Sequence, residues 1–400
     1  MKIFRSIYNW VSGIGVTMAR EYRVIFHDAG VMLFFFFLPI VYPLIYTLIY
    51  NPEIVEDMPI VVVDQSQTAD SRQLIRMLDA TQSMKVYTQA VTLDEARNMM
   101  FAGEANAIFV IPADYSRQLG RMEPATIPVY CDMSLLLRYR AILSSMTDIQ
   151  LQLVSELTAE RVNTYGLGSL VSGTMPIESN SNMMGDPTQG FASFIIPGIV
   201  VLILQQSMLL GITLIGGSRR ERLNFGPYKN YPRDVPGVTV TVLGRALAYV
   251  ILYIPLCLYI LDWVPRIFSL PHYGSILDAL LFIFPMLLAT AFLGQAIVAF
   301  TKEREIPFLL VVFSSVIFLF LSGLTWPRYA MPDVWKWAGD LVPATWGVEG
   351  FIRINNNAAT LAETATPYHA LWILTGVYFL AALLITYLLR RREPLDRRAI

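Results

Sequence analysis

Residues 31–50 read VMLFFFFLPIVYPLIYTLIY, and this run decides the class of the fold. No Asp, Glu, Lys or Arg interrupts it. A helix needs about 20 mostly apolar residues to cross the ~30 Å hydrocarbon layer of a bilayer. The run therefore predicts a membrane-spanning helix. Its length, the long polar segment before it and the lack of a small-x-small cleavage site after it argue against a cleavable signal peptide.

The composition of the whole chain supports an integral membrane protein. Of 400 residues, 55% are hydrophobic and 15% are charged, whereas soluble domains average about 25% charged. A formal net charge of −1 gives no indication of nucleic-acid binding. The two cysteines, Cys131 and Cys257, lie in unlike settings and predict neither a disulfide framework nor a metal site. Three widely separated histidines argue against a His-based metal or catalytic site.

Six stretches are long and apolar enough to predict membrane spans. They lie at 31–50, 191–216, 239–261, 276–300, 306–324 and 370–390. Cytoplasmic loops of membrane proteins carry an excess of Lys and Arg. The basic segments here are the N-terminus, the loops after the second and fourth spans, and the C-terminus. The short loop after the third span carries only Arg266, and the loop after the fifth carries only Arg328, Lys336 and Arg353. Both termini are therefore predicted to be cytoplasmic, and residues 51–190 extracytoplasmic.

Residues 59–131 alternate strand-like and helix-like runs, which predicts a small α/β domain between the first two spans. A long amphipathic helix over 134–165 follows. Asp64, Asp70 and Asp114 fall at turn and cap positions, where Asp serves as a local hydrogen-bond acceptor. No histidine lies between residues 51 and 190, which excludes a Ser/His/Asp triad inside the domain. The domain is interpreted as a binding or docking module.

The predicted fold class is an α-helical integral membrane protein with six transmembrane helices, an α/β extracytoplasmic domain and a long amphipathic helix. The first 28 residues form a cytoplasmic helix, with Ile3, Ile7, Trp10, Ile14 and Met18 on one face, suited to the membrane surface. The further boundaries are 29–50 for the first span, 51–190 for the outer domain, 191–390 for five spans, and 391–400 for a basic tail. The five-span region includes a cytoplasmic loop at 217–237 and an external loop at 325–369.

Two segments of the chain resemble a known family. The first is VVVDQSQTADSRQLIRMLDA (61–80) with VTLDEARNMMFAGEANAIFVIPADYSRQL (91–119), and the second is FLSGLTWPRYAMPDVWKWAGDLVPATWGVEGFIRI (320–354). In this order they resemble the type-2 ABC exporter permeases that carry a large external domain after the first span. The cytoplasmic loop departs from the family pattern E-x-G-T-x-E-x-L, which only Glu221 and Leu223 match.

The resemblance implies a permease subunit of an ATP-driven exporter in a bacterial inner membrane, not an enzyme. The chain contains no G-x-x-x-x-G-K-[ST] motif, so ATP and Mg are expected on a separate cytoplasmic ABC ATPase subunit. The other implied partners are a second copy or a paralogous permease, a periplasmic adaptor and membrane lipid, with no nucleic acid. The apolar spans and the family together suggest a drug-like or lipid-like amphiphile as the cargo.

Two groups of residues are the candidate functional sites. The cytoplasmic charges are predicted to contact the ATPase, although setting topology explains single arginines equally well. They are Arg219, Arg220, Glu221, Arg222, Leu223, Lys302, Glu303 and Arg304. Polar residues inside spans are usual functional pointers, although many only join helices. The polar residues inside the predicted spans are taken as a candidate cargo pathway. They are Gln205, Gln206, Ser207, Gln295, Ser314 and Ser315.

Four tryptophans cluster before the last span, namely Trp326, Trp335, Trp337 and Trp346. Anchoring at the membrane interface explains them, and short re-entrant helices there would close the outer end of a pathway. The alternative function is a membrane-anchored receptor or assembly scaffold with a ligand- or partner-binding outer domain. A membrane-embedded enzyme would need a deep His, Asp or Glu cluster, which the sequence does not show. An ion-coupled carrier would usually show internal repeats, and the sequence shows none.

Overall fold

The computed structural model describes residues 2–50, 55–121, 123–133, 136–164, 190–225, 237–298 and 305–392. At 2–7, 136, 157–164, 220–225, 307 and 390–392 it describes the backbone only. The chain divides into two compact units. We call Met1–Asn51 with Met183–Ile400 the helical unit, and Pro52–Asn182 the sheet unit.

Five helices among the described residues are long and apolar enough to cross a membrane, and they belong to the helical unit. They cover Ala29–Tyr50, Phe191–Arg219, Val238–Ile267, Ile276–Ile297 and Ala365–Leu389. The first is built from α2 (Ala29–Met32), the π-helical η1 (Leu33–Phe37) and α3 (Leu38–Tyr50). The third is built from α9 (Val238–Leu258), the π-helical η3 (Tyr259–Trp263) and α10 (Val264–Ile267). The others lie in α8 (Phe191–Phe225), α11 (Ile276–Ile297) and α15 (Ala365–Arg392).

The predicted span at 306–324 corresponds to a shorter helix, α12 (Glu305–Leu321). Its 17 residues rise about 25 Å at 1.5 Å per residue, which is less than the ~30 Å hydrocarbon layer. A sixth span therefore stays a prediction. The N-terminal amphipathic helix is present as α1 (Lys2–His27). Asp28 ends it and caps the first span, because its carboxylate accepts hydrogen bonds from the backbone N–H of Gly30 and Val31.

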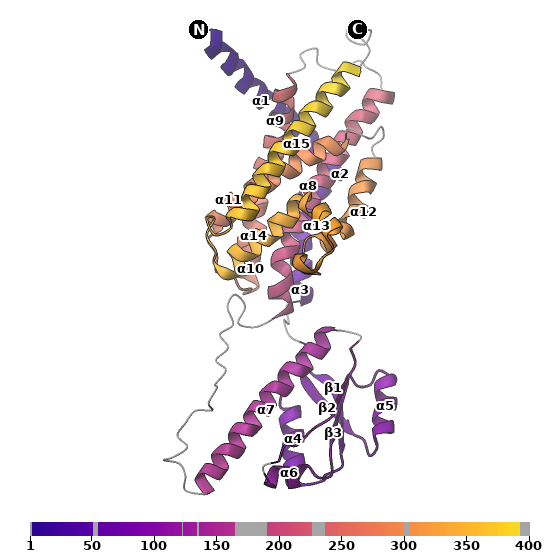
Figure 1. The fold of residues 1–400 in the computed structure, drawn as a ribbon. Helices are drawn as coiled ribbons and strands as arrows, with labels where there is room; N and C mark the ends of the chain where they lie inside the picture. Colours follow the sequence, from indigo (N-terminus) through magenta and orange to yellow (C-terminus); the bar gives the residue numbers. More distant parts are fainter. Residues whose placement is uncertain are drawn as a thin grey trace. The chain divides into compact units, whose positions relative to one another are not determined.

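The segment predicted as an external loop, 325–369, is largely helical. It contains η5 (Arg328–Ala330), α13 (Asp333–Asp340) and α14 (Pro343–Asn357), and α15 begins at Ala365. α14 packs against α8, α11 and α15, and most residues of its inner face are buried. Figure 1 shows α14 among the long helices of this unit, with α1 toward one end. α14 is thus part of the core of the bundle.

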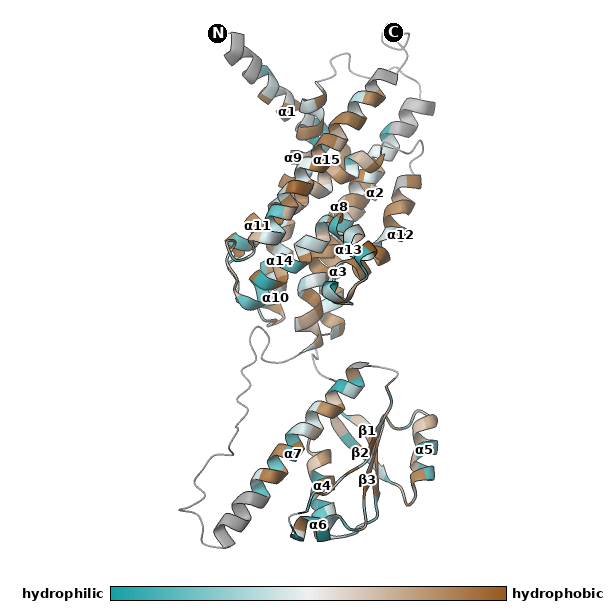
Figure 2. Ribbon diagram, viewed as in Figure 1, coloured by the Kyte–Doolittle hydropathy of each residue, from teal (hydrophilic) through white to brown (hydrophobic). Residues whose placement is uncertain are grey.

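One apolar cluster holds the helical unit together. It includes Phe35 from η1, Met208 from α8, Tyr253 from α9 and Phe282 from α11, all buried. Other faces of these helices stay apolar and exposed, for example at Phe313 of α12 and Leu380 of α15. In Figure 2 the ribbons of the long helices are coloured mostly brown, for hydrophobic residues. An apolar outer face is what lipid contact requires.

The sheet unit is built on four strands in the order β2-β1-β3-β4. The strands are β1 (Met58–Asp64), β2 (Met84–Gln89), β3 (Ala107–Ile111) and β4 (Val129–Cys131). β2 and β3 both run parallel to β1, and β4 runs antiparallel to β3. β1 is central and buried on both faces, which explains its continuous run of Val and Ile in place of alternation.

Helices cover both faces of this sheet (Figure 1). α4 (Ala69–Asp79), α6 (Tyr115–Arg121) and α7 (Leu136–Thr164) pack on one face around Phe109. α5 (Leu93–Phe101) packs on the other face around Ile108. The order of strands and helices along the chain is the one that the alternating sequence pattern predicts.

Candidate functional site

A buried carboxylate joins three helices at one end of the helical unit. Glu21 lies on α1, and its side chain is 2% exposed. It forms an ion pair with Arg219 of α8. Arg245 of α9 places its Nε 2.9 Å from Glu21 Oε1. We call Glu21, Arg219 and Arg245 the Glu21 node.

The node keeps Glu21 ionised. Burial by itself raises the pKa of this carboxyl group, because the charged form loses its hydration. The guanidinium groups of Arg219 and Arg245 outweigh burial, so the pKa of Glu21 lies below its usual value. The Tyr249 hydroxyl adds a hydrogen bond to the carboxylate. A charge that is buried and paired in this way ties the positions of α1, α8 and α9 to one another.

α1 also packs closely on α9 next to the node. A Cβ atom on Gly244 of α9 would lie 2.8 Å from Cβ of Thr17 and 3.2 Å from the carbonyl oxygen of Ile14. Only glycine therefore fits at this crossing without a shift of α1. The close contact and the node lie on the same side of α1, so a movement of α1 has to move α9 or break both.

The structure describes only some of the residues predicted to contact the ATPase. Arg219 belongs to the Glu21 node. Arg220, Glu221, Arg222 and Leu223 lie in the last turns of α8, where the structure describes the backbone only. Lys302, Glu303 and Arg304 lie outside the described residues. Glu21 was missed from the sequence, although it follows Ile14 by seven positions and so falls on the apolar face of α1.

The predicted pathway residues meet neighbouring helices. Gln206 Nε2 donates to the carbonyl oxygen of Val311 on α12 over 2.5 Å. The Tyr253 hydroxyl of α9 donates to Ser207 Oγ over 3.0 Å. Gln295 Nε2 donates to the carbonyl oxygen of Val242 on α9 over 3.3 Å. Ser314 and Ser315 bond to carbonyl oxygens of their own helix. Among the described residues these side chains are distributed over several helix contacts and do not gather in one cavity.

Gln205 has a different role, at the beginning of the buried helix α14. Its Oε1 accepts a hydrogen bond of 2.6 Å from the backbone N–H of Ala344. The residue before α14, Val342, has no side-chain oxygen with which to cap the helix. A fully buried glutamine of α8 therefore supplies the cap that the local sequence of α14 lacks.

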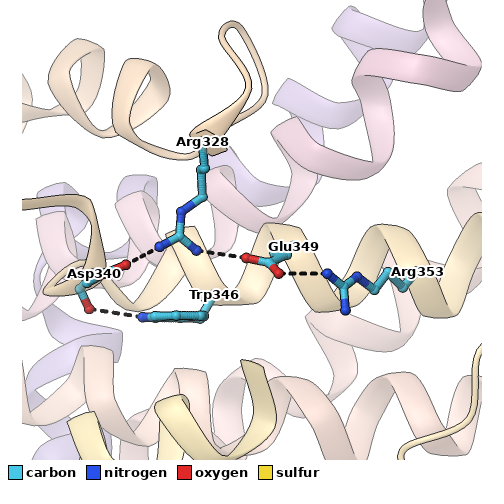
Figure 3. Close-up of polar contacts among 5 residues, drawn as sticks. All are labelled: Arg328, Asp340, Trp346, Glu349 and Arg353. Atoms are coloured by element: carbon cyan, nitrogen blue, oxygen red, sulfur yellow. Dashed lines mark hydrogen bonds and ion pairs between the residues drawn. The ribbon is translucent and has the colours of Figure 1, made fainter. Parts of the chain in front are cut away.

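A four-charge cluster holds the middle of α14 (Figure 3). Arg328, in η5, forms ion pairs with Asp340 at the end of α13 and with Glu349 of α14. Glu349 also meets Arg353 one turn later, over 2.8 Å. The guanidinium carbon of Arg328 lies 4.4 Å from the ring centre of Trp346, a cation–π contact. The cluster connects η5, α13 and α14.

Trp346 packs within this cluster, and its place at the membrane interface stays a prediction. Its indole N–H donates to the carbonyl oxygen of Asp340 over 3.0 Å, and its ring lies against Arg328. Trp346 is therefore a packing residue of α14 and has its polar group satisfied within the protein. Trp326, Trp335 and Trp337 are exposed, as interfacial anchors have to be.

A third polar group holds the end of α14. Asn355 donates from Nδ2 to the carbonyl oxygen of Pro271 over 3.1 Å, and its own carbonyl oxygen accepts from the N–H of Tyr273 over 2.9 Å. His272 Nδ1 lies 2.7 Å from Asn355 Oδ1. α14 is thus fixed by polar contacts at its beginning, its middle and its end.

Polar residues of the sheet unit act locally, as the sequence predicts for its aspartates. Asp64 accepts from the backbone N–H groups of Ser66 and Gln67. Asp114 accepts from Gln118 Nε2. Asp70, in the first turn of α4, differs, because it accepts a hydrogen bond from Ser116 of α6, 46 positions along the chain. The cap predicted at Thr92 is also present, because its hydroxyl accepts from the N–H of Glu95 over 3.2 Å. The described part of the chain holds no cluster of His, Cys, Asp and Glu fit for a metal ion.

The chain matches a known family over nearly all of the described spans. A family model described as "ABC-2 family transporter protein" matches residues 30–384. The match begins at the second residue of the first span and ends inside α15, so it includes the sheet unit and α14. No curated protein shows a significant match to the chain.

Proposed function

The chain belongs to the ABC-2 family of transporter proteins, and from this membership we propose that it is the membrane subunit of an ATP-driven exporter. Members of this family are the membrane permeases of ABC transporters, which work with an ATPase subunit. The proposed cargo is a hydrophobic or amphipathic compound, either drug-like or lipid-like, that leaves the cytoplasm or the inner leaflet.

The energy would come from a separate cytoplasmic ATPase chain that binds ATP and Mg, because this chain contains no P-loop motif. The Glu21 node is the observation that carries the proposal. It joins the amphipathic helix α1 to the ends of two spans through buried charges. A push on α1 or on the end of α8 would therefore be passed to both spans. The charged segments 220–223 and 302–304 would be the surfaces that the ATPase meets.

The cargo pathway would run along apolar helix faces. No Asp, Glu, Lys or Arg lies in the central turns of the five described spans. Such a surface suits an amphiphile better than an ion, because an ion would require deep charged groups. Gln206 contacts α12 where α8 meets it, and Ser314 and Ser315 of α12 lie nearby, both half-buried. We propose this contact as the polar part of the pathway, completed by a second copy or a paralogous permease.

The orientation follows the distribution of basic residues. With Lys2, Arg5, Arg20 and Arg23 in α1, the N-terminal helix would lie on the cytoplasmic side of a bacterial inner membrane. The sheet unit would then face outward, where it would guide released cargo or dock a periplasmic adaptor. Its polar groups serve turns and caps, which supports a docking role over a catalytic one.

Purification from native membranes tests the proposed function. We expect the tagged chain, extracted in mild detergent, to carry a P-loop ATPase in a fixed ratio. Replacing residues 220–223 by alanine should remove the ATPase. Arg117→Ala with Arg121→Ala, in exposed parts of the sheet unit, is the charge control and should leave the complex intact. A pure chain without any nucleotide hydrolysis, from membranes that express an ABC ATPase, would favour a receptor or scaffold.

A further inference from the structure

The helix α1 presents three different faces along its length. One face packs on α9, with Thr17 at the Gly244 crossing and Glu21 in the Glu21 node. A second face is apolar or small, and most of its residues are exposed. Its members follow one another at spacings of three or four positions, which places them on one side of the helix. They are Tyr8, Val11, Gly15, Ala19, Tyr22 and Phe26, of which Tyr22 alone is half-buried.

The third face holds the basic residues of α1. Arg20 and Arg23 are exposed on this face, and neither forms an ion pair with another described residue. The only acid of the helix, Glu21, points the other way, and the two arginines of the Glu21 node balance its charge. The basic face therefore has no counter-charge from its own helix. By helical position it contains Lys2, Arg5, Arg20, Arg23 and His27.

The apolar face of α1 continues into the exposed side of the first span. The ring of Phe26 stacks on that of Phe36 in η1, with 5.7 Å between the ring centres. Leu33 and Phe37, in the same π-helical segment, are exposed. Apolar side chains that stay exposed on a span contact lipid. The apolar face of α1 thus begins at the lipid-facing side of the first span.

We propose that α1 lies on the membrane surface through its apolar face, and that Arg20 and Arg23 beside it bind the headgroups of anionic phospholipids. A helix with adjoining apolar and basic faces suits the boundary between headgroups and acyl chains. Guanidinium groups bind phosphate oxygens through charge-assisted hydrogen bonds. Anionic lipids are favoured over zwitterionic ones, because no ammonium group in the headgroup offsets the phosphate charge.

A bilayer fits this surface better than a protein partner does. A cytoplasmic protein would have to cover an apolar face that is continuous with the lipid-facing side of a span, whereas a bilayer covers both at once. The placement of the faces also differs from the one that the sequence predicts. Ile14, predicted for the membrane side, has its carbonyl oxygen at the crossing with Gly244 of α9.

Hydrogen exchange in bilayers of defined composition tests the proposal. The full chain is placed in nanodiscs of phosphatidylcholine, with or without phosphatidylglycerol, and the exchange of residues 8–19 is followed by mass spectrometry. We expect phosphatidylglycerol to slow this exchange about tenfold, the order of effect for two arginines at an anionic surface. Exchange of residues 93–101, in α5 of the sheet unit, should be the same in both bilayers. About 1 M NaCl, which shortens the Debye length to about 3 Å, should remove most of the difference.

Two double variants decide whether the basic face is the cause. Arg20→Gln with Arg23→Gln should lose most of the response to phosphatidylglycerol. Arg121→Gln with Lys336→Gln removes as many positive charges at exposed positions outside α1 and should keep the wild-type response. The salt dependence of the wild type decides the question if the first variant does not fold.

Three results overturn the proposal. The first is a wild type that does not respond to phosphatidylglycerol, or whose response is unchanged by salt. The second is an equal response in Arg20→Gln with Arg23→Gln, which would assign the effect to the bilayer as a whole. The third is exchange that slows only when an ATPase is added, whatever the lipid, which would make this surface of α1 a protein contact.

This inference requires a chain in a bilayer but not an exporter. If no ATPase accompanies the chain but the exchange of residues 8–19 follows phosphatidylglycerol through Arg20 and Arg23, the exporter proposal fails and lipid binding stands. If transport is ATP-driven and the exchange is the same in both bilayers, lipid binding fails and the exporter proposal stands.

Discussion

The two units of this protein differ in how far along the chain their polar side chains reach. In the sheet unit, most polar contacts join residues close in sequence, such as Asp64 with Ser66 or Thr92 with Glu95. In the helical unit many hydroxyl groups also bond within their own helix, but several buried polar side chains connect distant elements. Glu21 and Arg219 are 198 positions apart, and Gln205 and Ala344 are 139 apart.

The difference follows from the two surroundings. In water, burial of apolar surface drives the sheet and its helices together, so polar groups have only to satisfy turns and helix ends. Between helices in lipid that driving force is absent, because the acyl chains are as apolar as the side chains. Close packing together with polar and charged contacts then decides which helices meet. The helical unit should accordingly be sensitive to loss of single polar groups, and the sheet unit to loss of apolar volume.

The largest effect is expected at Glu21. Glu21→Leu removes the carboxylate that Arg219 and Arg245 share, and loss of one partner of a buried ion pair typically costs about 3–5 kcal/mol. We expect a sharp fall in the melting temperature of the helical unit, followed by thermal unfolding of the detergent-solubilised chain. Glu104→Leu, at an exposed position of the sheet unit, should have almost no effect. Equal effects at the two positions would contradict the proposed difference between the units.

Phe109→Ala tests whether the sheet unit is sensitive to loss of apolar volume. Phe109 is fully buried in β3, and such truncations cost about 3–5 kcal/mol. Limited proteolysis should cut the sheet unit readily, while the helical unit keeps its melting temperature. Phe101→Ala, at an exposed residue of α5, is the matched control and should leave the cutting pattern unchanged. Resistance of Phe109→Ala to the protease would show that the apolar core is not what stabilises this unit.

Gln205→Leu has an intermediate expected effect. It removes the hydrogen bond to Ala344 and leaves a buried backbone N–H unsatisfied, at about 1–3 kcal/mol. Hydrogen exchange should accelerate at the beginning of α14, around 344–347, and much less at its end. Ser315→Ala, at a half-buried position of α12, provides a comparison that removes only an intrahelical bond. Unchanged exchange at 344–347 would mean that packing alone holds α14.

The stability of the helical unit at acid pH should depend on the Glu21 carboxylate. Its pKa is lowered in the folded protein, so its stabilising effect is complete above the usual value of 4.5 and is lost as the pH falls through the lower folded value. One proton changes the free energy of unfolding by at most about 1.4 kcal/mol per pH unit. Glu21→Gln should show a shallower loss of melting temperature below pH 4.5. A slope identical to that of the wild type would place the acid-sensitive group elsewhere.

The smallest effect is expected at a local cap of the sheet unit. The Thr68 hydroxyl accepts from the N–H of Ser71 and caps α4. Thr68→Ala should cost about 1 kcal/mol. Urea unfolding followed by proteolysis of the sheet unit measures the change, and Thr88→Ala on the edge strand β2 serves as the control. A loss as large as that of Phe109→Ala would mean that polar contacts matter as much here as in the helical unit.

The sequence predicts local elements well and distant contacts poorly. The apolar runs predict the five long spans, and alternating patterns predict the order of strands and helices in the sheet unit. The apolar runs and the alternating patterns can each be recognised within a stretch of about 20 residues. The Glu21 node is not visible in this way, because an acid on the apolar face of α1 does not indicate which arginines it meets. Arg219 was selected from the sequence only as a member of a basic loop.

α14 shows a second limit of reading the sequence. PATWGVEGFIRINNN contains a proline, two glycines and several polar residues, and so resembles a loop. Its burial depends on its neighbours. A Cβ atom on Gly350 would lie 2.0 Å from Cζ of Phe282, so glycine allows α14 to approach α11. The cap at its beginning comes from Gln205, far away in sequence. Neither feature can be found by counting local propensities.

We propose that the Glu21 node couples ATP hydrolysis to transport. The direct measurement is the number of fluorescent short-chain phospholipids moved per ATP hydrolysed, in liposomes that contain the chain and its co-purified ATPase. We predict that Glu21→Gln lowers this ratio at least tenfold while hydrolysis continues. An unchanged ratio in Glu21→Gln, in protein that is folded and bound to the ATPase, would contradict the account.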